Sequence, residues 1–390
     1  MKRVHMGARI MAGTALVTLS LLAAMPAHAD SRSQAKRLHD RLAGVPPSPA
    51  TLNTMASMIS GGDALGAANL AMQAPSFYNA TLKNWITPWT NRDQTAFVPL
   101  NDYTATVIGM IRDDKPFNTL LSADILYVGG SGLPAYSSAN NTLYQQLEDQ
   151  DLNLGDSAVL VESTQSAHSA LPPAATAGVL TTRAAAQAFF IAGTNRAMFR
   201  FTMLNHMCKD LEQVHDVTRP PDRIRQDVSR SPGGDSRLFL NNCIGCHNGM
   251  DPLAQAFAYY NYDETAGSIQ YTAGVVQPKY GINSDNFKQG YVTRNDGWDN
   301  YWRKGANPLL GWSGALPGSG NGAKSMGQEL ANSDQFAQCQ VEKVFKTVCL
   351  RPPVDLADRT EVTRITGLFK ANGYKVKQVF AEAAVHCMGL

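Results

Sequence analysis

The motif Asn242-Cys243-Ile244-Gly245-Cys246-His247 constrains the fold of this 390-residue chain more than any other sequence feature. Two cysteines two residues apart, followed at once by a histidine, form the attachment pattern of c-type haem. Each thiol adds to one vinyl group of the porphyrin, and the next side chain then lies under the iron as its proximal ligand. The motif therefore predicts one covalently attached haem c, held by Cys243 and Cys246 and ligated by His247.

Two other chemistries use the same residue types. A thioredoxin-like dithiol site also has two cysteines at this spacing, and it is the main alternative to haem attachment. A zinc site would need a further pair of Cys or His ligands at short spacing, and none follows Cys246 and His247 in the sequence. The address of the protein, described next, favours haem over the dithiol.

Residues 1–29 have the three parts of a secretory signal peptide. A positive n-region precedes an apolar run at residues 10–24, and Ala27-His28-Ala29 is a cleavage site of small residues. The mature chain is expected to begin at Asp30 and to be periplasmic or secreted, where c-type haem is attached. An uncleaved anchor would need a longer apolar run. No later stretch is apolar for long enough to cross a bilayer, so no transmembrane span is expected in the mature chain.

Four cysteines remain outside the motif, namely Cys208, Cys339, Cys349 and Cys387, and an oxidising compartment favours their pairing. Three connectivities are possible. Cys339 and Cys349 lie in one predicted helix, about 15 Å apart, whereas a disulfide needs Cα atoms within about 7 Å. We therefore expect at least one disulfide and favour Cys349–Cys387, because both residues end C-terminal helices that should pack as neighbours. Four free thiols are the alternative.

The hydrophobic pattern predicts a mainly α fold with an N-terminal helical domain at residues 30–233 and a helical haem domain at 234–390. A long insertion at about 260–320, rich in Tyr, Trp, Gly and Asn, interrupts the second domain. We expect this insertion to be loop-rich and packed by its own aromatics; the alternatives are cover for one haem edge or a docking surface. Trp85 and Trp89 are four apart and are expected to share a buried helix face.

The second axial position of the iron has several candidates. Met326 follows the Gly-rich stretch 318–322, expected to be a flexible turn, and precedes a helix beginning near Ser333. In simple cytochromes c the distal Met likewise lies between a flexible loop and a helix. Met203, His206 and Met207 on a buried helix are the alternatives. A core methionine is the plain interpretation of Met326.

Asp251 is expected to cap the next helix and Pro252 to open it. The remaining histidines are expected at the surface or in satisfied contacts, namely His39, His168, His215 and His386.

The chain resembles a family of large secreted haem proteins first noticed in planctomycetes, built of linked domains of unknown function around one C-x-x-C-H. The phrase Cys243-x-x-Cys246-His247-x-x-Met250-Asp251-Pro252-Leu253 is similar to the family's C-x-x-C-H-x-x-[IM]-D-P-L. Weaker likeness covers residues 178–196 and the helices at 336–376. The chain departs from the family at residues 254–257, where G-x-x-x-E is usual. The resemblance implies a mostly helical, cytochrome c-like haem protein and no established activity.

Two function classes follow. A single haem with both axial positions filled suits an electron-transfer protein that exchanges electrons with a redox partner protein, whereas an open iron site suits a peroxidase- or oxygenase-type haem enzyme. The sequence leaves enzyme activity uncertain and favours electron transfer, because related haem enzymes usually carry two such motifs. No phosphate loop or hydrolase triad pattern is present. A net charge of +2 with 17% charged residues argues against a nucleic-acid partner.

Overall fold

The computed structural model describes residues 30–191 and 193–389; the predicted signal peptide lies outside these described residues. The fold is mainly α, as expected. The longer α-helices are α1 (Ser31–Ala43), α2 (Pro49–Ser60), α3 (Ala64–Ala71), α5 (Asp102–Arg112), α6 (Thr142–Asp149), α8 (Arg183–Phe189), α9 (Arg196–Met207), α11 (Ile244–Ala254), α12 (Gly322–Ala331), α13 (Asp334–Cys349), α14 (Leu356–Ala371) and α15 (Val376–Cys387). The shorter ones are α4 (Lys83–Ile86), α7 (Gln165–His168) and α10 (Ser236–Leu238).

Among the described residues, three small antiparallel sheets of two strands each accompany the helices. The strands are β1 (Leu126–Gly129), β2 (Leu160–Ser163), β3 (Tyr260–Asp263), β4 (Ser268–Tyr271), β5 (Gly297–Asp299) and β6 (Ser319–Asn321). In the register of these pairs, Leu126 lies opposite Ser163, Tyr260 opposite Tyr271, and Trp298 opposite Gly320. Within the described residues no helix is both long enough and apolar enough to cross a membrane.

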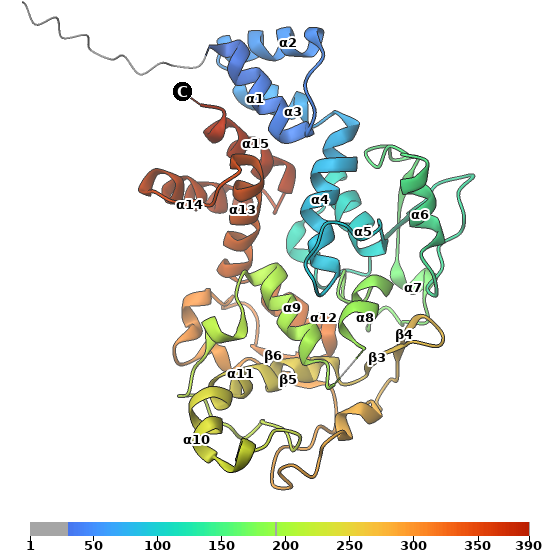
Figure 1. Cartoon of the computed structure of the whole chain (residues 1–390), viewed down its shortest axis with the longest axis vertical. Helices are drawn as coiled ribbons and strands as arrows, with labels where there is room; N and C mark the ends of the chain where they lie inside the picture. Colours follow the sequence, from blue (N-terminus) through green and yellow to red (C-terminus); the bar gives the residue numbers. More distant parts are fainter. Residues whose placement is uncertain (1–29, 192, 390) are drawn as a thin grey trace, which may run out of the picture.

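The N-terminal and C-terminal helices pack against each other at one end of the molecule (Figure 1). Helices α1 and α3 contact α15, and α1 also contacts α13. Phe380 of α15 packs edge-on against Phe77 at 5.3 Å and against Trp85 at 5.3 Å. Elements on both sides of residue 233 therefore contribute to one continuous hydrophobic core. Trp85 and Trp89 lie in it as a buried edge-to-face pair at 4.6 Å, which confirms their predicted core role.

Local sequence signals set several helix ends. Asp63 accepts a hydrogen bond from Gly66 N and caps α3, and Thr182 does the same for α8 through Ala185 N. Ser333 caps α13 through Phe336 N, and α13 ends at Cys349, three residues before Pro352. These caps supply partners for backbone N–H groups that have none inside the helix.

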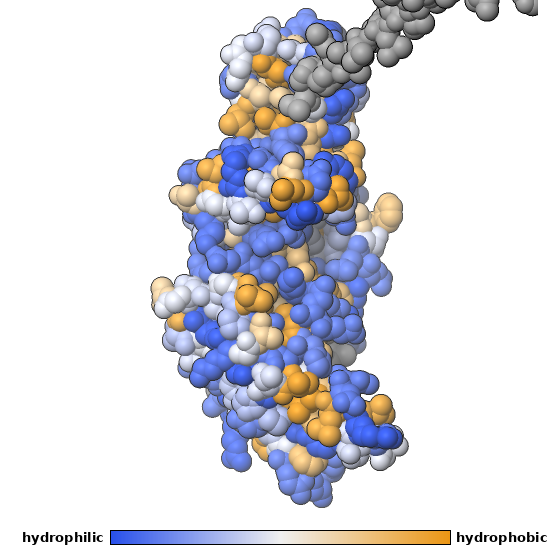
Figure 2. All heavy atoms as spheres, turned by 90° about the vertical axis from the view of Figure 1, so that its left-hand side faces the viewer, coloured by the Kyte–Doolittle hydropathy of each residue, from blue (hydrophilic) through white to orange (hydrophobic). Residues whose placement is uncertain are grey.

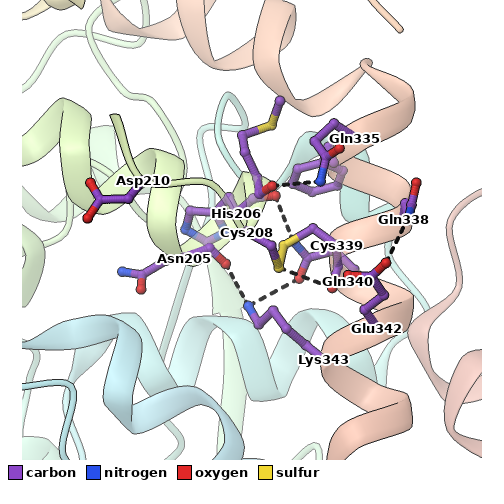
Figure 3. The surroundings of a disulfide bond; sticks show 12 residues. Asn205, His206, Cys208, Asp210, Gln335, Gln338, Cys339, Gln340, Glu342 and Lys343 are labelled. Carbon is purple, nitrogen blue, oxygen red and sulfur yellow. Dashed lines mark hydrogen bonds between the residues drawn. A yellow bond between two sulfur atoms is a disulfide. The ribbon is translucent and has the colours of Figure 1, made fainter. Parts of the chain in front are cut away.

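The four cysteines outside the motif form two disulfides, Cys208–Cys339 and Cys349–Cys387, each with Cα atoms 5.4 Å apart. The favoured pair is thus confirmed. The first bond joins the end of α9 to α13 (Figure 3). Beside it, side chains of α13 satisfy the last carbonyls of α9: Lys343 Nζ donates to Asn205 O, Gln340 Nε2 to His206 O, and Gln335 Nε2 to Met207 O. This junction ends α9 and fixes it to α13.

The aromatic insertion is loop-rich with short strands, as expected. Tyr260 and Tyr271 pack on each other within it, with ring centroids 4.9 Å apart, but Tyr260 also packs on Phe190 and Trp302 on Phe199, so the insertion joins the main core and does not pack on itself alone. Tyr260, Trp298 and Trp302 are buried. The stretch 318–322 differs from its expected form as a flexible turn, because it contains β6, which pairs with β5. Gly320 permits this pairing, since a Cβ there would lie 3.1 Å from the Trp298 ring. Helix α12 then begins directly at Gly322.

Candidate haem-attachment site

The motif lies where a single π-helical turn, Phe239–Cys243, passes into α11. Such π turns are rare and occur frequently at functional sites. Cys243 ends the turn, and Cys246 and His247 lie three and four residues further, which places the three side chains on one helix face. All three are partly exposed, and both thiols are free. The structure thus brings the predicted attachment residues together.

The thiols have different surroundings. Cys243 packs against a small apolar cluster of Ile224, Val228 and Phe239. Cys246 Sγ lies 3.5 Å from the carbonyl oxygen of Leu211, to which it donates. Burial, with a smaller contribution from the Glu212 charge, raises the pKa of the Cys246 thiol. Dithiol redox sites depend on cysteines whose pKa is lowered, so this environment is unfavourable to the thioredoxin-like alternative.

His247 is held by a carboxylate one helical turn away. Its Nδ1 lies 3.2 Å from Oδ1 of Asp251, and the His247 side chain is 21% exposed while Asp251 is fully buried. The predicted cap at Asp251 is wrong, since α11 continues through Asp251 and Pro252 to Ala254. Pro252 removes one hydrogen bond inside the helix, and the chain passes into a 3₁₀ turn at Gln255–Phe257.

Two arginines surround the Asp251 carboxylate. Arg196 donates to both of its oxygens, at 2.7 and 2.9 Å, and to both oxygens of Asp227, at 2.6 and 2.9 Å. The backbone N–H of Arg225 also donates to Asp251 Oδ2 at 3.3 Å. Although burial opposes ionisation, the Arg196 charge and then His247 hold the pKa of Asp251 well below its usual range. Asp251 is therefore a buried anion.

The opposite face of α11 carries two glycines at helical spacing. A Cβ on Gly245 would lie 2.3 Å from His215 Nε2, and one on Gly249 would lie 2.0 Å from Trp302 Nε1. His215 is exposed, as expected, yet it packs closely on the motif helix from behind. The spacing Gly245-x-x-x-Gly249 was the sequence signal for this close approach.

The candidates for the second axial position lie in the packed interior. Met326 is fully buried in α12, which packs against the turn Gln255–Phe257, β5 and the turn Phe117–Thr119. His206 Nε2 lies 2.7 Å from the hydroxyl of Tyr103, and Met207 Sδ accepts from Ser333 Oγ at 3.6 Å. Met203 is buried on the same helix. The structure thus places these candidates in core contacts and the motif on a partly exposed helix face.

The other histidines predicted to be structural have partners. His39 Nδ1 lies 2.8 Å from Val45 O, His168 Nε2 lies 2.8 Å from Ser163 Oγ, and His386 Nε2 lies 3.1 Å from Asp358 Oδ1. These contacts confirm that the three are satisfied.

Searches against protein-family models, curated proteins and solved structures found no match for this chain. The chemistry of the site therefore follows from its own side chains, two thiols and an imidazole. Within the part of the chain that the structure describes, no three His, Cys, Asp or Glu side chains gather as ligands of a metal ion. Two free thiols and an imidazole on one face, with Nδ1 occupied by Asp251 and Nε2 remaining for iron, fit a covalently attached haem.

Proposed function

We propose that this chain is an exported mono-haem c-type cytochrome that carries electrons to or from a partner protein in the periplasm or outside the cell. One observation carries the proposal: Cys243, Cys246 and His247 share a partly exposed face of α11, with both thiols free and His247 Nδ1 already bonded. The two disulfides fit an oxidising compartment.

The residues of the site have separate roles in this function. Cys243 and Cys246 would hold the haem by thioether bonds, and His247 Nε2 would bind the iron. The bound haem supplies a one-electron couple. Exposed apolar side chains next to the motif, Leu238 at 45% and Leu240 at 54%, fit brief contact with a partner, because weak redox complexes bury little area. The lower part of the face in Figure 2 likewise mixes hydrophobic residues with hydrophilic ones.

The second axial ligand remains part of the proposal. We keep Met326 as the candidate that would complete an electron-transfer site. Its full burial in the core favours the second candidate function, a peroxidase- or oxygenase-type haem enzyme with an open iron site. An absorption spectrum of the wild-type protein separates the two. A six-coordinate, low-spin ferric spectrum with the weak far-red band of methionine ligation supports electron transfer, whereas a high-spin spectrum with free binding of carbon monoxide supports the enzyme.

Haem attachment itself is tested by substitution. The wild-type chain, exported from a host that matures c-type cytochromes, should retain haem stain on a denaturing gel, and Cys243→Ala/Cys246→Ala should lose it. The matched control is Cys349→Ala/Cys387→Ala, which removes two cysteines remote from the motif and should keep the stain. Full stain in the motif variant, or none in the exported wild-type chain, would contradict the proposal.

A further inference from the structure

The Asp251 carboxylate has no freedom to turn away from His247. Its Oδ1 accepts from Arg196 Nε at 2.7 Å and lies 3.2 Å from His247 Nδ1, while its Oδ2 accepts from Arg196 Nη2 at 2.9 Å and from the Arg225 backbone N–H. Its side chain is fully buried. Four donors from three different segments therefore fix this carboxylate next to His247 Nδ1.

We propose that Asp251 is the positioning residue of His247, which fixes the imidazole for iron binding through Nε2 and lowers the reduction potential of the attached haem. The inference rests on the proposed haem attachment. A carboxylate that accepts from the second ring nitrogen of a metal-binding histidine fixes its tautomer and orientation and raises its basicity as a ligand. A more basic ligand stabilises ferric over ferrous iron, so the potential falls.

The charges around Asp251 allow the effect of its hydrogen bond to His247 to be distinguished from the electrostatic effect of a nearby carboxylate. Two arginines, Arg196 and Arg225, are paired with the two carboxylates Asp251 and Asp227, and the Arg230 charge interacts with both carboxylates. Asp227 shares Arg196 with Asp251, and no hydrogen bond of the described residues joins it to His247. Removing either carboxylate takes away one negative charge, but only the removal of Asp251 changes the partner of His247.

The experiment compares Asp251→Asn with Asp227→Asn in the full-length protein carrying its haem. Both variants should raise the midpoint potential, because each removes one negative charge near the haem. We expect Asp251→Asn to exceed Asp227→Asn by about tenfold in the equilibrium constant for haem reduction, which is ~59 mV for a one-electron couple. Asp251→Glu, which keeps the charge, should return toward the wild-type potential. Equal shifts in the two Asn variants would overturn the inference.

A second measurement covers the case in which Asp251→Asn does not fold. Wild-type protein labelled with ¹⁵N-histidine should show a proton on His247 Nδ1 that is protected from exchange with solvent. A Nδ1 proton that exchanges freely would overturn the inference. Failure of the proposed function looks different, since the exported wild-type chain would then carry no covalent haem at all.

Discussion

The C-terminal helices and the segment that leads into the haem motif are held together by different forces. Helices α13–α15 contribute a run of fully buried side chains to the main core, and the two disulfides join α13 to α9 and to α15. This segment, residues 216–245, is called the motif segment below, and it has a separate core of only three buried apolar residues, Ile224, Val228 and Phe239. Apolar burial, which is the dominant stabilising force in folding, is therefore scarce in the motif segment.

Arginine side chains hold the motif segment instead. Arg230 donates to the carbonyl oxygens of Ile224, Arg225 and Val228, at 2.9, 3.2 and 2.6 Å. Its guanidinium lies over the rings of Phe239, at 5.0 Å, and Phe287, at 4.4 Å. Such charge-assisted hydrogen bonds are stronger than neutral ones. The comparison indicates that a loop with few buried apolar residues can be ordered by arginine side chains that donate hydrogen bonds to the backbone carbonyl groups of that loop.

The largest expected effect concerns the disulfide-linked side of this comparison. Cys208→Ala/Cys339→Ala opens a closure of 131 residues and should lower the free energy of unfolding by about 5 kcal/mol. Cys349→Ala/Cys387→Ala opens one of 38 residues and should cost about 4 kcal/mol. Urea unfolding followed by circular dichroism measures both. Midpoints equal to wild type in both variants would show that packing alone holds α13 in place.

Substitutions at Met326 test whether this residue only packs in the core or also binds the iron. Met326→Ala should cost about 2–5 kcal/mol, because Met326 is fully buried. Met326→Leu nearly preserves the volume and should cost less than about 1.5 kcal/mol. If the Met326 sulfur binds the iron, the Leu variant also loses the far-red band and binds carbon monoxide. An unchanged spectrum of Met326→Leu would identify Met326 as a core residue only.

The features that could be predicted from the sequence are those that depend on neighbouring residues. Caps such as Asp63 and Ser333, the ends of α13 and α15 and the favoured disulfide were predictable, because they follow from local residue chemistry and helix spacing. The attachment residues share a helix face for the same reason. The partner of His247 was not predicted, since Asp251-Pro252 has the sequence of a helix start.

Long-range contacts explain these misses. Arg196 lies 55 residues before Asp251 and gives the buried carboxylate its partner. Likewise, Gly320 looked like part of a flexible turn, and only its pairing with Trp298 makes the stretch a strand. Sequence periodicity carries no information about such contacts.

On the arginine-held side, Arg230→Met should weaken the motif segment alone. Three backbone carbonyls lose a charged donor, and we expect a cost of about 2 kcal/mol in local opening. Hydrogen exchange should speed up at residues 216–245 and stay unchanged in α13–α15. The matched control is Arg237→Met, whose side chain is 81% exposed and pairs only with Asp235, so it should cost less than about 0.5 kcal/mol. Faster exchange throughout the molecule would contradict the separation of the two regions.

The smallest effect concerns Lys279, a partly buried lysine. Unlike the arginines, which stay charged at any accessible pH, it can lose its charge. Lys279 Nζ donates to Phe190 O at 2.7 Å and to Asn261 Oδ1 at 2.8 Å, and burial lowers its pKa to about 8 from the usual 10.5. Between these two values the unfolded chain binds more protons than the folded one, so stability rises with pH across the window. The penalty of the buried charge is complete below pH 8.

Lys279→Met removes this dependence. Relative to the variant, wild-type protein should gain about 1 kcal/mol in the free energy of unfolding between pH 7.5 and 9.5, a value reduced for the partial exposure of the side chain. Urea unfolding at several pH values measures the difference in unfolding free energy between wild type and variant. Tyrosines and the other lysines ionise equally in both proteins, so their contributions cancel in this difference. Parallel curves for the two proteins would mean that Lys279 keeps its proton when folded as readily as when unfolded, and that it holds the insertion in the same way as an arginine.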